Sequence, residues 1–148
     1  MKALFKNDKK KILNLLKSTY GIESSPHLFL SFGKEKIRIF SGSLSLKELG
    51  ILDTNINIET VGLYAFNLKN DEIRLTLDSL YVYKDQITKN IIDLSDDTAL
   101  EWFKGSDLFI NKQRSFVVLK NQDDLIGCGK STGEKITNFM PKERRIRE

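Results

Sequence analysis

Residues 126–148 read IGCGKSTGEKITNFMPKERRIRE, and this stretch decides the fold of the C-terminal half. Gly127 and Gly129 alternate along a strand-like run, so both present bare backbone on the same face of the predicted strand. Glycine inside a strand often marks a bulge, a barrel corner or the close approach of another backbone. Gly133 then predicts a turn, and Pro141 ends strand pairing because it has no N–H to donate. The stretch therefore predicts a hairpin, followed by an arginine-rich segment that leaves the sheet.

Short apolar runs separated by turn residues precede this hairpin and continue through it. Ser95 is a suitable N-cap for a helix, and Gly105 ends that helix. Along the chain the sequence predicts a strand over 90–94, a helix over 96–104, and strands over 107–110, 115–120, 125–130 and 135–140. Short strands spaced by turns in this way are typical of a small, strongly curved sheet or barrel.

The N-terminal half alternates helices with hairpins. Apolar residues at helical spacing among lysines predict a helix over 8–20, with Gly21 at its end. The sequence then predicts a hairpin of 27–32 with 35–40, a short helix over 43–49, a hairpin of 61–68 with 72–77, and a short helix from Asp78 to Tyr83. The chain is therefore predicted to be α+β, with an N-terminal α/β unit over 1–68 and a C-terminal β unit with short helices over 69–148.

Charge is unevenly distributed along the 148 residues, whose formal net charge is +4. Residues 1–17 carry a net charge of +5, residues 18–104 a net −4 and residues 105–148 a net +3. Basic ends favour a polyanionic partner such as RNA, although lysine-rich helix faces are also commonly just solvated. The single cysteine excludes an internal disulfide and fits a reducing cytoplasm, and no apolar run approaches the ~20 residues that span a bilayer. We expect a cytoplasmic protein with no membrane partner.

Residues capable of catalysis are few. His27 is the only histidine. Cys128 is the sole thiol, but a cysteine between glycines in a strand is usually a small core filler. Asp96 and Asp97 in the first turn of a helix are more often dipole compensation than a cation site, and no Cys or His cluster has metal spacing. The sequence therefore predicts no enzyme activity, no cofactor and no metal site.

Three blocks of residues carry a family resemblance: the helix end at 104–108 (KGSDL), the apolar run at 115–119 (SFVVL) and the glycine strand at 124–129 (DLIGCG). From Ile73 to its end the chain resembles a PUA domain, the RNA-binding module of pseudouridine synthases and archaeosine transglycosylases. The C-terminal block is similar to the PUA-like tail of Sun-family RNA cytosine methyltransferases and to small archaeal proteins with a C-terminal PUA domain. The family's glycine-alanine and proline-glycine pattern after the helix is absent, since Ser106 follows the helix-ending glycine.

The resemblance implies a pre-PUA α/β unit followed by a PUA-like β pseudobarrel that binds RNA, without the catalytic domain of the methyltransferases. The expected function is a non-enzymatic accessory factor for RNA modification or ribosome assembly. Its expected partners are structured tRNA or rRNA, together with an RNA-modifying enzyme or ribosomal protein. Arginine side chains fork onto phosphates. The expected RNA-binding residues are Lys104, Gly105, Lys130, Lys142, Arg144, Arg145 and Arg147.

Several alternatives stay open at this level. The arginine tail also suits a mobile, solvated end. The acidic middle of the chain suits an interaction module that docks a basic enzyme or ribosomal protein, through Asp71, Glu72, Asp78, Asp85, Asp93, Asp96 and Asp97. Candidates for stacking on RNA bases are Tyr81, Tyr83, Phe116 and Phe139, each of which also suits the core. The sequence does not indicate an oligomeric state.

Overall fold

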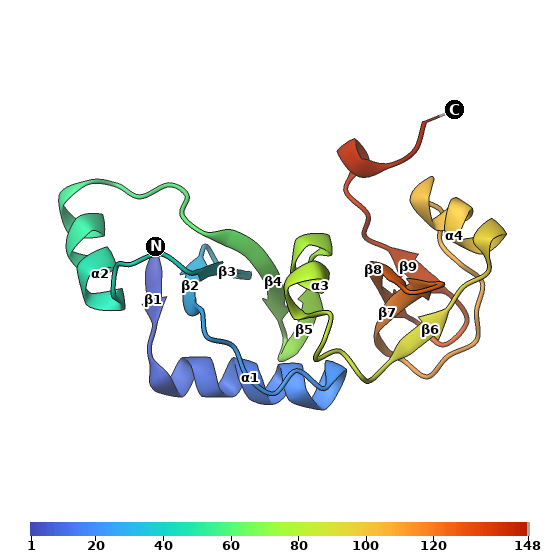
Figure 1. Ribbon diagram of the computed structural model, residues 1–148, viewed down its shortest axis with the longest axis horizontal. Helices are drawn as coiled ribbons and strands as arrows, with labels where there is room; N and C mark the ends of the chain where they lie inside the picture. Colours follow the sequence, from blue (N-terminus) through green and yellow to red (C-terminus); the bar gives the residue numbers. More distant parts are fainter. Residues whose placement is uncertain (148) are drawn as a thin grey trace.

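The computed structural model describes residues 1–147 and contains two β-sheets that lie side by side along the molecule (Figure 1). The strands are β1 (Lys2–Leu4), β2 (Leu28–Phe32), β3 (Lys36–Phe40), β4 (Leu63–Lys69), β5 (Glu72–Leu75), β6 (Ile91–Asp93), β7 (Ser115–Asn121), β8 (Asp124–Ser131) and β9 (Ile136–Asn138). The helices are α1 (Lys6–Tyr20), α2 (Leu46–Asn55), α3 (Leu77–Tyr83), α4 (Asp96–Phe103) and the 3₁₀ helix η1 (Lys142–Arg144). This mixture confirms the predicted α+β class. None of the helices in residues 1–147 is long and apolar enough to cross a membrane.

The N-terminal sheet is antiparallel in the order β1-β2-β3-β4-β5, and α1 runs along it (Figure 1). Ile12, Leu16 and Tyr20 fall on one face of α1 because they lie about one helical turn apart, and all three are buried. The helix ends at Gly21, which is left-handed and donates its N–H to the carbonyl of Lys17. The predicted helix over 8–20 is therefore confirmed, with a start at Lys6.

Three local predictions for this half need correction. The strand β1 was not predicted, because three residues are too short for a periodic signal. Helix α2 starts later than expected, because Ser45 and Glu48 form a reciprocal capping box, and it runs past Gly50 to Asn55. The short helix at 77–83 is capped by Thr76, whose hydroxyl accepts from the Ser79 N–H at 3.3 Å, rather than by Asp78.

The C-terminal sheet has the order β6-β7-β8-β9, with β6 parallel to β7 and the other pairs antiparallel. The predicted strands at 90–94, 115–120, 125–130 and 135–140 are found, and Ser95 caps α4 as predicted. The predicted strand at 107–110 is wrong: only Leu108 pairs, in a single bridge with Ile136. Its neighbour Asp107 instead accepts the N–H of Asn138 through its side chain, which ends the ladder.

Strand β7 is buried on both faces, which explains its continuous apolar sequence. Val118 packs with residues of the N-terminal sheet, whereas Val117 and Leu119 pack with Trp102 of α4. The glycines of β8 make room for that indole ring, since a Cβ atom on Gly127 would collide with Nε1 of Trp102. The alternating glycines therefore mark a close approach, one of the three features that the sequence left open: Trp102 approaches both glycines, and the Thr137 carbonyl also approaches Gly129.

The two sheets share one core. The buried cluster of the N-terminal sheet includes Val118 and Cys128 from the C-terminal sheet. The connection at 84–90 is held to the end of α1, where Asn90 Nδ2 donates to the Thr19 carbonyl at 2.6 Å. The predicted boundary between 68 and 69 falls inside β4, within the β4–β5 hairpin. Because a paired hairpin is one hydrogen-bonded unit, we propose that the boundary lies at 84–90, after α3.

Replacing Gly50 by alanine is expected to stabilise the protein by about 0.5–1 kcal/mol. Gly50 lies inside α2 in open space, so a Cβ atom meets nothing within 4 Å and the helix gains a better former. Chemical denaturation would measure the change. The matched control is Gly21→Ala, which should destabilise, because Gly21 has a φ of 85° and its added Cβ would collide with Thr88. A loss of stability in Gly50→Ala would contradict the open environment.

Candidate nucleic-acid interface

The C-terminal tail returns to the N-terminal unit through Arg144. Pro141 leaves the sheet, η1 follows, and the Arg144 guanidinium donates two hydrogen bonds to the two carboxylate oxygens of Asp78, at 2.9 and 3.1 Å. Such forked pairs combine charge with fixed geometry. These hydrogen bonds also raise the pKa of Arg144 above its already high ordinary value. Arg144 therefore links the tail to α3, so this part of the tail is not a free, solvated end.

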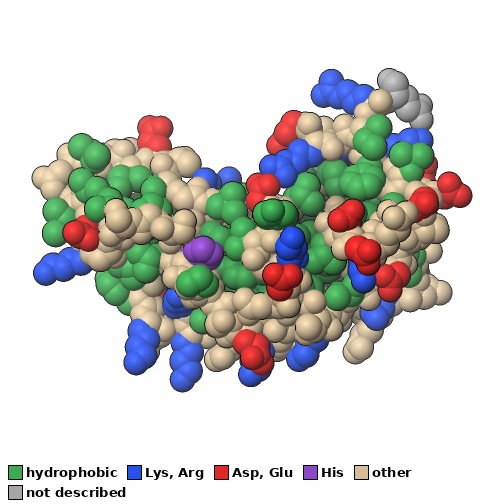
Figure 2. Space-filling view, viewed as in Figure 1, with side chains coloured by type: hydrophobic (Ala, Val, Ile, Leu, Met, Phe, Trp, Pro, Cys, Tyr) green, Lys and Arg blue, Asp and Glu red, His purple; other side chains and the backbone are tan. Residues whose placement is uncertain are grey.

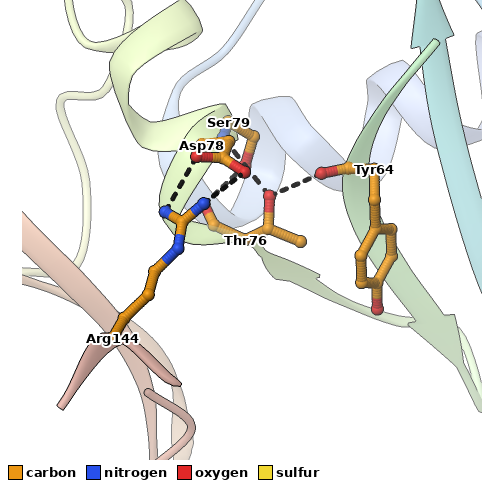
Figure 3. A network of polar contacts seen from close by, with 5 residues as sticks. All are labelled: Tyr64, Thr76, Asp78, Ser79 and Arg144. Atoms are coloured by element: carbon orange, nitrogen blue, oxygen red, sulfur yellow. Dashed lines mark hydrogen bonds and ion pairs between the residues drawn. The ribbon is translucent and has the colours of Figure 1, made fainter. Parts of the chain in front are cut away.

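Asp78 is held in place by the start of α3 (Figure 3). The Thr76 hydroxyl caps the helix and donates to the carbonyl of Tyr64 at 2.8 Å. The Ser79 hydroxyl donates back to the Thr76 carbonyl at 2.9 Å. Asp78 lies in the first helical turn, where the helix dipole favours a negative charge. The N-terminal unit thus presents this carboxylate to the tail of the C-terminal unit.

Arg145 is held in a second place, against the end of α4. Its Nε donates to the Met140 carbonyl at 3.1 Å, and its side chain lies directly over Gly105. Gly105 has a φ of 94°, and a Cβ atom there would collide with the arginine. The Ile146 N–H donates to the Phe103 carbonyl at 2.9 Å. The structure therefore brings Gly105 and Arg145 together, as neighbours in a packed contact.

The other four predicted cations lie in different surroundings. Lys104 forms an ion pair with Glu101 at 3.5 Å. Lys130 donates to Glu72 at 2.5 Å and lies 5.1 Å from the centre of the Phe116 ring. The side chains of Lys142 and Arg147 are exposed and have no hydrogen-bond or ion-pair partner within residues 1–147. The seven predicted residues thus form no single cluster, and the cations available to a phosphate without breaking a contact are Lys142 and Arg147 on the tail. A role in RNA binding for any of the seven stays a prediction.

A pocket of about 290 Å³ lies where the two units meet, beside the Arg144–Asp78 pair. Sequence reasoning found Arg144 and Phe139 but missed most of this pocket, since its walls come from β4, β5, α3, α4, β8 and the tail. On one wall the Arg74 guanidinium lies 4.5 Å from the centre of the Phe139 ring. The lining residues include Tyr64, Arg74, Thr76, Asp78, Trp102, Cys128, Phe139 and Arg144.

The four aromatic candidates for base stacking separate into core and surface. Tyr83 is a core residue: it is buried, its hydroxyl bonds Ser25 at 2.7 Å, and burial raises its pKa. Tyr81 is 76% exposed and lies under Lys84, away from the tail pocket. Phe116 and Phe139 form a tilted pair 6.2 Å apart, and Phe139 is 37% exposed. Of the four, Phe139 lines the pocket between the units.

Cys128 also lines this pocket, but its chemistry does not suit a nucleophile. Its Sγ lies 3.6 Å from the Tyr20 hydroxyl, which itself donates to the Ile73 carbonyl at 2.6 Å. Burial raises the pKa of the Cys128 thiol, so the reactive thiolate is disfavoured. Within residues 1–147, no group of three or more His, Cys, Asp or Glu side chains is arranged to hold a metal ion. Asp96 instead accepts hydrogen bonds from Asn121 and Gln122, which lower its pKa.

The acidic middle of the chain is largely engaged in contacts within the protein. Asp71 pairs with Lys11, Glu72 with Lys130, and Asp78 with Arg144. Asp96 is also hydrogen-bonded. Within the described residues, the carboxylates of this set without a hydrogen-bond or ion-pair partner are therefore Asp85, Asp93 and Asp97. The predicted docking role of this region stays a prediction, and no observation favours it over the tail.

Asp107 anchors the loop after Gly105, and the cost of removing it should depend on pH. Hydrogen bonds from the Asn138 N–H and Lys135 lower its pKa. A lowered folded-state pKa stabilises the protein above the ordinary value of about 3.9 and loses that effect as the pH falls through the folded value. Asp107→Ala should therefore cost about 1 kcal/mol at pH 7, from the lost hydrogen bonds, and less below pH ~3. Denaturation at both pH values tests this, and an equal cost at both would contradict the charge-dependent part.

The C-terminal unit is a small sheet with a preceding helix that ends in a glycine, which is the arrangement that the PUA resemblance implies. A family model described as the methyltransferase RsmF PUA domain matches residues 89–146. This segment of the chain is therefore similar to that PUA domain. The match begins after the connection between the units, so β5 and α3, which the resemblance had included, lie outside it.

Two curated relatives are also similar to part of this chain. Each is a ribosomal RNA small subunit methyltransferase F of Vibrio vulnificus, from strains YJ016 and CMCP6, and each is 38% identical over 56 residues. The matched segment covers 37% of this chain but only 12% of each methyltransferase. The similarity therefore concerns one domain of those enzymes. The archaeal source implied by the resemblance stays a prediction.

Proposed function

We propose that this protein is a non-enzymatic RNA-binding accessory factor that takes part in RNA modification or ribosome assembly. The observation that carries the proposal is the PUA domain at 89–146, since PUA domains are RNA-binding modules. The names of the two relatives support rRNA of the small subunit as the first RNA to test. Structured tRNA is the second, and an RNA-modifying enzyme or ribosomal protein is the proposed protein partner.

Two basic regions support a polyanionic ligand. Blue side chains gather along the lower edge of the molecule, where α1 lies, and at the end of the tail (Figure 2). Part of the α1 charge is used internally, because Lys9 donates to the carbonyls of Ser25 and His27. The tail, by contrast, carries exposed Lys142 within the segment that matches the PUA domain, and exposed Arg147 directly after it. We therefore place the phosphate contacts on the tail, where they position RNA without reading its sequence.

The absence of catalysis belongs to the same proposal. The family model that matches residues 89–146 describes a PUA domain, and the match with the methyltransferases covers 12% of their length. The buried Cys128 thiol, with its raised pKa, is a poor nucleophile. Incubation with small-subunit rRNA and labelled S-adenosylmethionine should give no methylated RNA, and incorporation of label above a heat-denatured control would overturn this part of the proposal.

Binding to RNA can be tested directly across a salt series. Fluorescence anisotropy of labelled small-subunit rRNA fragments and of tRNA should show an affinity that falls steeply between about 50 and 200 mM salt, because bound cations release counterions from the phosphates. A DNA duplex of the same length is the control for charge alone. No binding to either RNA at the lowest salt would sink the proposal, and equal affinity for the duplex would reduce it to nonspecific attraction.

A further inference from the structure

The pocket between the two units combines a flat aromatic wall, cations and unused hydrogen-bond donors. We infer that it takes in the base of one unpaired nucleotide of the bound RNA. This inference rests on the proposed RNA binding, and it adds where and how a base is held. Proteins generally recognise RNA through unpaired bases, which stack on aromatic rings or guanidinium planes and are hydrogen-bonded along their edges.

The wall formed by Phe139 and Arg74 offers the stacking surface. The two side chains lie 4.5 Å apart, from guanidinium carbon to ring centre, and they come from the PUA domain and from β5 of the N-terminal unit. Both also line a neighbouring hollow with Phe116 and Lys130, where Lys130 lies 5.1 Å from the Phe116 ring centre. Arginine over an aromatic ring provides planar faces of the kind that bind bases by stacking and cation–π attraction.

The size of the pocket limits what can enter. A volume of about 290 Å³ is close to the lower limit for ligand sites, which is about 300 Å³. A flat base fits a site of this class, whereas a base pair within an RNA helix does not. The inferred occupant is therefore a nucleotide from a loop, a bulge or a single-stranded end.

The polar groups of the pocket include unused donors beside the carboxylates of Asp78 and Glu143. The Nε1–H of Trp102 is buried and has no hydrogen-bond acceptor within residues 1–147. It lies against Gly127, and both residues line the pocket. Buried donors normally have a partner. Arg144 has further N–H groups beyond the two bound to Asp78. Carbonyl oxygens and ring nitrogens of a base are acceptors of the kind that these donors lack.

The exposed cations of the tail follow closely in sequence from residues that line this pocket. Pro141 and Glu143 line the pocket, and the side chain of Lys142 between them is exposed, with no hydrogen-bond or ion-pair partner in the part of the chain that the structure describes. A base held beside Phe139 would thus have its phosphates next to the positive tail. The N-terminal unit is needed for this site as well, because Arg74, Thr76 and Asp78 come from it.

The only tryptophan of the chain reports on the pocket. Trp102 fluorescence and the anisotropy of a 5′-labelled strand would be followed together while single-stranded RNA pentamers are titrated in. A pentamer with an abasic central nucleotide is the matched ligand. We expect the intact pentamer to quench Trp102 at the concentrations at which anisotropy rises, and the abasic pentamer to bind about tenfold more weakly without quenching.

Two single variants distinguish the contribution of base stacking to RNA affinity from the contribution of charge. Phe139→Leu keeps apolar bulk but removes the ring, and Arg74→Gln removes the cation beside it, so each should weaken the intact pentamer by about tenfold and leave the abasic pentamer nearly unchanged. Phe109→Leu is the matched control, because Phe109 is 86% exposed and lines a different hollow. Circular dichroism would verify that each variant is folded.

The possible failures can be told apart. If no pentamer and no rRNA fragment changes the anisotropy, RNA binding itself is wrong. If the pentamers bind but the intact and abasic strands have equal affinity and leave Trp102 unquenched, RNA binding stands and the base pocket is wrong. The same conclusion follows if Phe109→Leu weakens binding as much as Phe139→Leu does.

Discussion

Trp102→Ala is expected to lower the free energy of unfolding by about 3–5 kcal/mol, the usual cost of removing a buried large aromatic side chain. Trp102 is completely buried in the core cluster of the C-terminal unit, where it packs with Leu108, Val117 and Ile136. Because its ring fits over the glycines of β8, no larger neighbour can move in to fill the cavity. Denaturation followed by circular dichroism would measure the loss, since the variant has no tryptophan to observe.

Substitution of Gly127, which lies against the Trp102 ring, gives a second measurement that is linked to the first. Gly127→Ala adds a Cβ atom against the indole and should cost about 1–3 kcal/mol through overpacking. In the Trp102→Ala background the same substitution should cost much less, because the atom that it strikes is gone. Such a double-mutant cycle isolates the contact between the two residues. Additive costs would mean that Gly127 is required for a reason other than the tryptophan.

Reversing the two exposed tail cations, in the double variant Lys142→Glu with Arg147→Glu, is expected to weaken rRNA binding by at least about tenfold at 0.1 M salt. It should also reduce the slope of log affinity against log salt by about two, one unit for each lost phosphate contact. Both side chains are exposed and have no hydrogen-bond or ion-pair partner within residues 1–147, so stability should change little. Anisotropy over the salt series measures both quantities.

Matched variants show whether the position of the charge matters. Lys34→Glu with Lys47→Glu removes the same charge from exposed sites on the N-terminal unit and should leave the affinity nearly unchanged. Arg144→Gln should change the salt slope less than the tail pair does, because Asp78 already neutralises Arg144. Its cost in stability should stay below about 1 kcal/mol, as for other half-exposed ion pairs. If the control pair weakens binding as much as the tail pair, the attraction is a property of net charge and not of the tail.

Sequence reasoning succeeded where a structural signal is carried by neighbouring residues. The buried stripe of α1 follows from the helical spacing of Ile12, Leu16 and Tyr20, and the start of α4 follows from the N-cap Ser95. The two N-terminal hairpins and most strands of the PUA domain have the same local origin. The prediction at 107–110 failed because Leu108 and Ile110 look like a strand, while the side chain of Asp107 takes the place of a ladder hydrogen bond.

Other features depended on residues far apart in the chain. Arg144 looked like a free phosphate ligand because its partner Asp78 precedes it by 66 positions. Gly127 and Gly129 left a bulge, a barrel corner or a close approach open, and only the fold shows that Trp102 approaches both of them. The pocket itself is formed where two separately patterned units share a core. Periodicity, caps and turn residues act over a few positions, so the sequence alone determined the elements and their class. Packing between distant side chains decided which cations are free and where a ligand can enter.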